Sequence, residues 1–177
     1  MRKLIMVCVL IFWGVSPAIA DGFGLGGFGG LNIPIVQDDQ SSGTVFGVKG
    51  RMELARNIIV EPGVGFGKFG DAEFSFGTRD GSKINSYGVD VLLGSGFGGS
   101  SGVNIFGILG AGVYSITRDY DDDATKFGWS TGLGLEFMMV PTLGLDVRGK
   151  VHVTSSEGGG SKKSATVTGG LNYYFGT

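Results

Sequence analysis

Hydrophobic and polar residues alternate one by one along much of this chain, and the pattern is clearest between Thr125 and Thr154. Pro141 and Thr142 separate two arms, and in each arm large apolar residues occupy every second position, with glycine, polar or charged residues between them. Successive side chains of a β-strand point to opposite faces of the sheet. Each arm is therefore predicted to be a strand with one apolar and one polar face, and the two arms to form a hairpin.

The same alternation recurs along the chain and predicts eight strands. Most segments keep their apolar residues on one parity, but the fifth is apolar on both, so the sequence does not assign its faces. No segment carries a helical period of comparable strength. The eight segments are residues 22–36, 44–55, 58–76, 83–94, 103–118, 125–140, 143–154 and 163–175.

The polar faces of these segments decide which side is the inside. They consist mostly of glycine and of charged residues of both signs. In a soluble sandwich the apolar face is buried, whereas in an outer-membrane barrel apolar side chains meet lipid and polar ones fill the lumen. The glycine-rich, charge-balanced faces favour the second arrangement.

The connections between segments also alternate in length. Polar connections of moderate length follow the first, third, fifth and seventh segments, and two-residue turns follow the second and sixth. The long connection between Gly94 and Gly102 is an exception. Barrels of the outer membrane have short periplasmic turns and longer extracellular loops, and closure leaves no free strand edge in lipid. We therefore predict an all-β fold, an eight-stranded antiparallel up-and-down transmembrane β-barrel. The expected extracellular loops are residues 37–43, 77–82, 119–124 and 156–162.

The first twenty residues have the layout of a cleavable secretory signal. Arg2 and Lys3 precede an apolar core, and residues 18–20 (Ala-Ile-Ala) give a small-x-small ending. The core is shorter than the ~20 apolar residues of a membrane anchor. We expect residues 1–20 to be a signal peptide and residues 21–177 to be the barrel domain.

Composition excludes several classes of function. The single cysteine, Cys8, lies in the predicted signal, so the mature chain is expected to have no disulfide, cysteine-zinc site or thiol nucleophile. Basic residues are neither abundant nor clustered, and the formal net charge is -2, which argues against a nucleic-acid partner. The 36 glycines lie inside the alternating segments, so they require a structural explanation.

Three features together resemble the small eight-stranded outer-membrane barrels of the OmpA transmembrane-domain and OmpX type. They are the signal ending at residues 18–20, the segment 60–67 (Val-Glu-Pro-Gly-Val-Gly-Phe-Gly) and the closing segment 171–175 (Leu-Asn-Tyr-Tyr-Phe). The resemblance implies a cell outer-membrane location and insertion by the barrel-assembly machinery. It also implies contact with outer-membrane lipid and lipopolysaccharide, and a monomeric state.

Parity assigns candidate residues to the two faces. The lumen should be plugged by a salt-bridge network, because an eight-stranded barrel is just wide enough for side chains to fill and buried ions need close partners. The inward glycines leave space, so a narrow porin-like channel is the alternative. The predicted lumen residues are Lys49, Arg51, Glu53, Glu61, Asp90, Glu136, Asp146, Arg148, Lys150 and His152. The predicted lipid-facing belt is Phe46, Phe66, Tyr87, Phe127, Trp129, Phe137, Tyr173 and Phe175.

Candidate chemistry is sparse, and we expect no enzymatic activity, cofactor or metal. A lipid A-modifying enzyme of this size would use a membrane-facing His-x-Ser pair, but His152 and Thr154 share the lumen parity. The aspartates at 119 and 121–123 lack the glycine and distal glutamate of a calcium loop, so a solvated acidic loop is the simpler interpretation. The Gly-x-Gly runs, such as Gly132 to Gly134, precede no helix and are not phosphate loops.

The sequence therefore favours a structural or interaction barrel of the outer membrane. The alternatives are the narrow channel and a surface binder whose loops touch host protein or lipopolysaccharide. A secreted soluble barrel that holds an apolar ligand is a further alternative, and solubility without detergent would identify it.

Overall fold

The computed structural model describes residues 22–35, 41–55, 57–74, 77–79, 81–94, 102–118, 121–155 and 161–175. The predicted signal peptide, most of the predicted loop 37–43 and the connection after Gly94 lie outside these residues. Within the described ranges, the chain has no helix of the length and apolarity needed to cross a bilayer.

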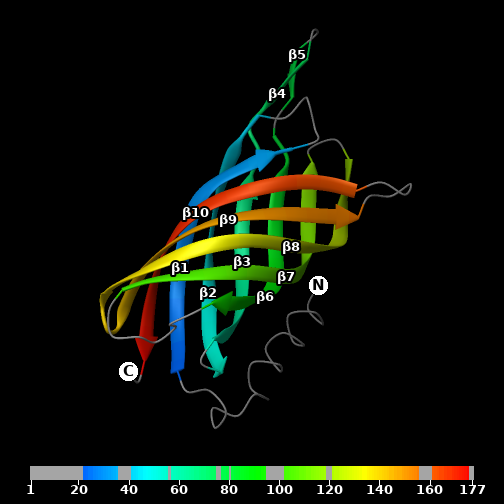
Figure 1. The fold of residues 1–177 in the computed structure, drawn as a ribbon. Helices are drawn as coiled ribbons and strands as arrows, with labels where there is room; N and C mark the ends of the chain where they lie inside the picture. The colour runs from blue at the N-terminus through cyan, green and yellow to red at the C-terminus, as the bar shows by residue number, and fades with distance from the viewer. Residues whose placement is uncertain are drawn as a thin grey trace.

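Eight strands form one closed antiparallel barrel, which confirms the predicted fold (Figure 1). Each strand pairs with its neighbours along the chain, and β1 closes the ring by pairing with β10. The order around the barrel is β1-β10-β9-β8-β7-β6-β3-β2. The strands are β1 (Gly22–Pro34), β2 (Gly43–Ala55), β3 (Ile58–Lys68), β6 (Lys83–Gly94), β7 (Gly102–Arg118), β8 (Asp121–Val140), β9 (Leu143–Ser155) and β10 (Ser161–Phe175).

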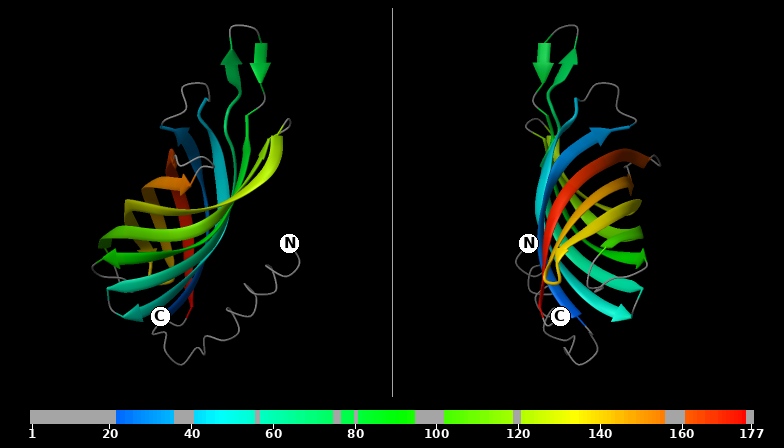
Figure 2. Two further views of the ribbon diagram at one scale, coloured as in Figure 1. Left: turned by 90° about the vertical axis from the view of Figure 1, so that its right-hand side faces the viewer. Right: turned by 60° about the vertical axis from the view of Figure 1, so that its left-hand side comes forward.

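The connection from β3 to β6 carries a separate two-stranded hairpin of β4 (Ala72–Phe74) and β5 (Gly77–Arg79). The prediction of one strand over 58–76 followed by a loop at 77–82 is therefore wrong. The Phe69 N–H donates to the Ser82 carbonyl oxygen at 3.0 Å, so the two arms stay paired as they leave the barrel. Figure 2 shows this hairpin projecting beyond the barrel end. The alternation continued past the barrel because it reports strands, not the sheet to which they belong.

Two other boundaries also differ from the sequence pattern. β8 begins at Asp121, inside the predicted loop 119–124, and β10 begins at Ser161, inside the predicted loop 156–162. Asp121 pairs with Arg118 and Ser161 pairs with Ser155. Backbone pairing carries the strands into polar sequence because ladder hydrogen bonds do not require apolar side chains.

The register fixes the tilt of the strands. A path of paired residues that starts at Gly22 and passes once around the barrel returns to β1 at Asn32, ten residues further on. Ten residues of stagger over eight strands give a tilt of roughly 40°. A barrel of this size has an interior that side chains can fill completely.

The two faces of the wall differ in chemistry. Large apolar side chains are exposed on the outside, and charged and polar side chains are buried inside. The structure also assigns the faces of β7: Val103 and Ile105 point outward, whereas Asn104, Phe106 and Ile108 are buried in the lumen. Both ends of the barrel chain lie at the end that carries the short turn at Pro141 and Thr142 (Figure 1).

Candidate functional site in the lumen

A network of buried charged side chains crosses the lumen. Lys49 and Arg51 are two residues apart on β2, and Asp146 and Arg148 are two residues apart on β9, so the members of each pair share one face of their strand. All four are buried, so that face is the lumen side. Each charged member is at most 5% exposed. We call the following eight residues the lumen network: Lys49, Arg51, Glu61, Glu136, Asp146, Arg148, Asn172 and Tyr174.

Arg51 lies at the centre of the lumen network. Its Nε donates to Glu61 Oε2 at 2.7 Å, its Nη1 to Glu136 Oε1 at 2.5 Å and its Nη2 to Asp146 Oδ2 at 3.0 Å. Nη1 also donates to the Tyr174 hydroxyl oxygen. The planar guanidinium suits this role because its five N–H groups diverge in fixed directions.

Arg148 and Lys49 complete the ionic part of the lumen network. Arg148 donates from Nη1 and Nη2 to the two oxygens of Glu61 at 2.5 and 2.8 Å, and from Nη2 to Asp146 Oδ2 at 2.8 Å. Lys49 Nζ lies 2.6 Å from Asp146 Oδ2. Charge-assisted pairs of this geometry are among the strong hydrogen bonds of proteins.

The charges of the lumen network balance. Three cationic side chains, Lys49, Arg51 and Arg148, face three carboxylates. Asn172 Nδ2 donates to Glu136 at 2.9 Å and to Asp146 at 2.7 Å, and the Tyr174 hydroxyl donates to Glu136 at 2.6 Å. A buried ion loses several kcal/mol of hydration, so this arrangement is stable only because each charge has close partners.

An apolar cluster fills the lumen beside the network. It comes from three adjacent strands: Ile59 on β3, Leu92 on β6, and Phe106 and Ile108 on β7. All four are at most 2% exposed. The Arg148 guanidinium lies over the Phe106 ring at 5.3 Å, which joins the cluster to the network.

Inward glycines make room for these side chains. A Cβ added at Gly170 would lie 2.8 Å from Asp146 Oδ1 and 2.9 Å from Lys49 Nζ, and one added at Gly134 would overlap the Phe106 ring. Real Cβ atoms essentially never approach other atoms within 3.0 Å. At this level of the barrel, the space left by the inward glycines is taken by the network and the apolar cluster.

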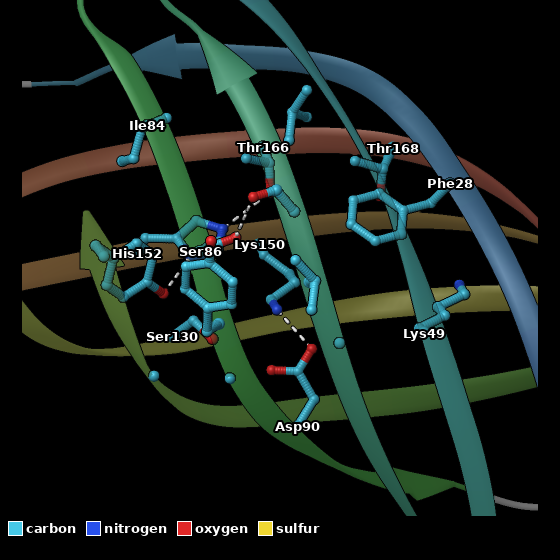
Figure 3. Close-up of a pocket in the computed structure, with 18 of the residues that line it drawn as sticks. Phe28, Lys49, Ile84, Ser86, Asp90, Ser130, Lys150, His152, Thr166 and Thr168 are labelled. Carbon is cyan, nitrogen blue, oxygen red and sulfur yellow. Dashed lines mark hydrogen bonds and ion pairs between the residues drawn. The ribbon is translucent and has the colours of Figure 1, made fainter. Parts of the chain in front are cut away.

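A cavity of about 110 Å³ lies between the network and the loop end of the barrel (Figure 3). Lys150 and Asp90 form an ion pair across it at 2.6 Å, with side chains 16% and 17% exposed. The volume is enough for several water molecules, and polar groups line it. Figure 3 shows Phe28 and Lys49 on one side of the cavity and His152 on the other.

The ten predicted lumen residues lie in three places. Six of them form the ionic part of the lumen network. Asp90, Lys150 and His152 lie outside the network and line the cavity, and Glu53 is half-buried towards the end of β2. His152 Nδ1 lies 2.9 Å from the Tyr114 hydroxyl, and its Nε2 lies 3.0 Å from Thr166 Oγ1.

The eight predicted belt residues all lie exposed on the outer face, between 39% and 62%. Phe46 and Phe66 contact each other near the loop end, with ring centroids 5.8 Å apart. Tyr173 and Phe175 contact each other at the turn end, with centroids 4.9 Å apart. Aromatic side chains near both ends of an apolar outer surface are typical of barrels that span a membrane.

Several lumen residues were absent from the sequence-based set. Parity could have identified Asn172 and Tyr174, since they oppose the outward Leu171 and Tyr173 on β10. Parity could not assign Phe106 and Ile108 to the lumen, because β7 is apolar on both faces.

Of the two other candidate sites, the structure places only His152. His152 points into the lumen, not towards the membrane as the lipid A-modifying alternative requires. Asp119 and the side chains of residues 121–123 lie outside the described part of the chain. Among the side chains that are described, no three His, Cys, Asp or Glu residues are placed to hold a metal ion.

Comparisons with known proteins point to the same architecture. Residues 5–175 match the outer membrane protein beta-barrel domain. No curated protein matches the chain. Neisserial surface protein A has a similar structure, with a TM-score of 0.67 at 12% identity over 86% of this chain and 97% of that one. The N-terminal barrel of OprF from Pseudomonas aeruginosa gives a TM-score of 0.59 at 11% identity over 88% of this chain and 98% of that one. OprG from the same organism also gives a TM-score of 0.59, at 14% identity over 89% of this chain and 98% of that one.

Proposed function

Since the chain belongs to the family of outer membrane protein beta-barrel domains, we propose that it is an integral outer-membrane protein whose barrel is closed to solutes. Its role is structural or one of interaction at the cell surface. It carries no chemistry of its own, and it works as a single barrel inserted by the barrel-assembly machinery.

This proposal is supported by ion pairs of the lumen network that join strands on opposite sides of the barrel. β2 and β8 lie four positions apart in the ring of eight strands, as do β3 and β9, so each pair lies on opposite sides of the barrel. Arg51 of β2 contacts Glu136 of β8, and Arg148 of β9 contacts Glu61 of β3. Two ion pairs thus cross the lumen in different directions, and the apolar cluster fills the sector between them.

The two ends of the barrel support a definite orientation. Outer-membrane barrels place short turns and both termini in the periplasm. The turn at Pro141 and Thr142 and both ends of the barrel chain share one end, and the β4–β5 hairpin extends from the other. We therefore place the β4–β5 hairpin and the cavity on the extracellular side and the lumen network nearer the periplasm.

Fractionation combined with liposome swelling tests this proposal. The full chain should fractionate with the outer membrane, and its folded form should migrate differently on gels when it is not boiled. Liposomes that contain the folded barrel should shrink in a hypertonic solution of a small sugar and should not swell again. Recovery of the protein in the soluble periplasm, or swelling as fast as with a general porin, would contradict it.

A second candidate function is binding at the cell surface through the β4–β5 hairpin. The observation in its favour is that this hairpin extends the extracellular end well beyond the barrel (Figure 2). A partner would be a host protein or lipopolysaccharide. Replacing residues 71–80 by a short Asn-Gly turn should leave the barrel folded and abolish adhesion of expressing cells to host matrix or to lipopolysaccharide-coated surfaces. Unchanged adhesion would exclude the hairpin as the binding element.

A further inference from the structure

Four neighbouring strands present a row of hydrogen-bond donors at the loop end of the outer face. Lys68 on β3 and Lys83 on β6 are directly paired in the register. On either side, Thr44 on β2 pairs with Lys68, and Thr117 on β7 pairs with Lys83. Paired residues of antiparallel strands point to the same face, so two ammonium groups are flanked by two hydroxyl groups. We call these four residues the Thr-Lys-Lys-Thr row.

The two lysines lie on the outer face of the wall. Buried and exposed residues alternate along both strands: Glu61 and Gly65 are buried on β3, Leu92 is buried on β6, and Lys68 and Lys83 fall on the opposite, exposed parity. The row therefore faces away from the lumen. A solute inside the barrel cannot reach it.

Like charges directly opposite each other in a sheet are destabilising. The described counter-charge is weak, because Asp71 lies 3.9 Å from Lys68 and both side chains are about half exposed. Among the described residues Lys83 has no ion pair. An anionic group placed between the two ammonium groups would remove this repulsion and bind to both.

The level of the row on the barrel identifies the anion. Phe66 precedes Lys68 by one outward position, and Tyr87 follows Lys83 by two, so exposed aromatic rings lie directly below the row. Outer-membrane barrels place aromatic side chains at the boundary between hydrocarbon and headgroups. A row of cationic and hydroxyl groups just beyond that boundary lies at the depth of lipid phosphates in the outer leaflet.

We propose that the Thr-Lys-Lys-Thr row binds a phosphate group of a phosphorylated glycolipid in the outer leaflet. The inference rests on the orientation in the proposed function. The two lysines contact the phosphate, the threonine hydroxyls donate to its remaining oxygens or to the sugar, and the acyl chains lie over Phe66 and Tyr87. A free phosphate would lack the last of these contacts, so the row selects the lipid.

Native mass spectrometry of the full-length folded barrel tests this proposal, with EDTA present so that divalent cations cannot bridge phosphates to acidic groups. The probes are bisphosphorylated lipid A, the same lipid after enzymatic removal of its phosphates, and inorganic phosphate. Wild-type protein should bind bisphosphorylated lipid A, and the double variant Lys68→Gln/Lys83→Gln should bind it roughly tenfold more weakly. Dephosphorylated lipid A should bind both proteins equally weakly, and millimolar inorganic phosphate should not displace the bound lipid.

The matched control removes two positive charges elsewhere near the same end of the barrel. Lys163 lies exposed on the outer face of β10 opposite Val153, and Lys126 lies on the lumen face of β8 opposite the buried Tyr114. Neither faces a second lysine, so this variant matches the loss of net charge without changing the row. Lys126→Gln/Lys163→Gln should retain wild-type affinity. Gel mobility of unboiled samples shows whether each variant is folded.

Each other outcome overturns the inference. Equal affinity of the Lys68→Gln/Lys83→Gln variant and the wild type for lipid A would show that the row does not bind this lipid. An equal loss of affinity in both double variants would show that binding depends on the net charge of the barrel and not on the row. Displacement by inorganic phosphate would contradict selection of the lipid. A folded, non-conducting barrel that does not prefer phosphorylated lipid A would overturn the lipid-binding proposal and leave the closed-barrel proposal intact. A barrel that passes solutes but binds phosphorylated lipid A through the row would overturn the closed-barrel proposal and leave the lipid-binding proposal intact.

Discussion

Arg148 and Glu61 form a two-pronged ion pair that spans the lumen, with Nη1–Oε1 and Nη2–Oε2 distances of 2.5 and 2.8 Å. The two residues are 87 positions apart in sequence and lie on opposite sides of the barrel. This pair holds the wall together across its interior as well as around its circumference. Its loss should therefore affect both stability and closure.

Replacing Glu61 with alanine should strongly destabilise the barrel. The change leaves the guanidinium groups of Arg148 and Arg51 buried with one carboxylate fewer. Removing one partner of a buried ion pair costs about 3–5 kcal/mol. Urea unfolding in lipid vesicles, followed by the mobility of unboiled samples, measures the free energy of unfolding. Asp71→Ala is the control, since it removes a hydrogen bond from the Gly81 N–H outside the lumen and an exposed pair with Lys68, and such a pair contributes at most about 1 kcal/mol.

Removing both partners should cost less than removing one. In the double variant Glu61→Leu/Arg148→Met neither charge of the pair is left without the other, and the side chains still occupy much of the same volume. Buried ion pairs replaced by apolar groups of similar size are often close to neutral. In the same unfolding assay, the free energy of unfolding of this double variant should be higher than that of Glu61→Ala. A double variant that unfolds more easily than the single one would show that the pair contributes more than mutual neutralisation.

Gly134 should tolerate no side chain, whereas Gly149 should tolerate one. A Cβ at Gly134 would overlap the Phe106 ring in the lumen, but a Cβ at Gly149 on the outer face would meet nothing within 4 Å. Overpacking typically costs about 1–3 kcal/mol. Gly134→Ala should therefore lower the urea midpoint, and Gly149→Ala should leave it unchanged or raise it. Equal midpoints would mean that Phe106 does not fill the lumen as described.

The outer face should reject a charge near the middle of the bilayer. Leu133 is 70% exposed on β8, in the central part of the outward apolar surface. Arginine on the lipid face of such barrels costs about 2–4 kcal/mol near the midplane and about 0–1 kcal/mol near the interface. Leu133→Arg should thus lose stability in vesicles, while Thr125→Arg, on the outer face nearer the loop end of the same strand and opposite Ser115, should lose little. A loss that is the same at both positions would contradict the membrane placement.

The sequence predicted the architecture because each strand carries its own face assignment. Lys49, Arg51, Asp146 and Arg148 could be assigned to the lumen from parity alone, since one face of each strand is apolar. Their partners could not be assigned, because the contact of Arg148 with Glu61 depends on the ten-residue stagger of the closed ring. That stagger results from all eight pairings together.

Two other features were also beyond the local pattern. Phe106 belongs to a strand that is apolar on both sides, so burial against Ile59 and Leu92 decided its face. The β4–β5 hairpin has the alternation of a barrel strand, and only its separate pairing distinguishes it. Alternation predicts that a segment is extended, but it does not predict which strands it pairs with.

Conductance of single barrels in a planar lipid bilayer tests the central claim most directly. Protein that gel mobility shows to be folded should give no current steps, because the lumen network and the apolar cluster close the lumen. The double variant Glu61→Ser/Arg148→Ser is the positive control, since it removes a pair that spans the lumen without changing the net charge, and it should give small steps. Wild-type barrels with steady steps as large as those of the variant would contradict a closed lumen.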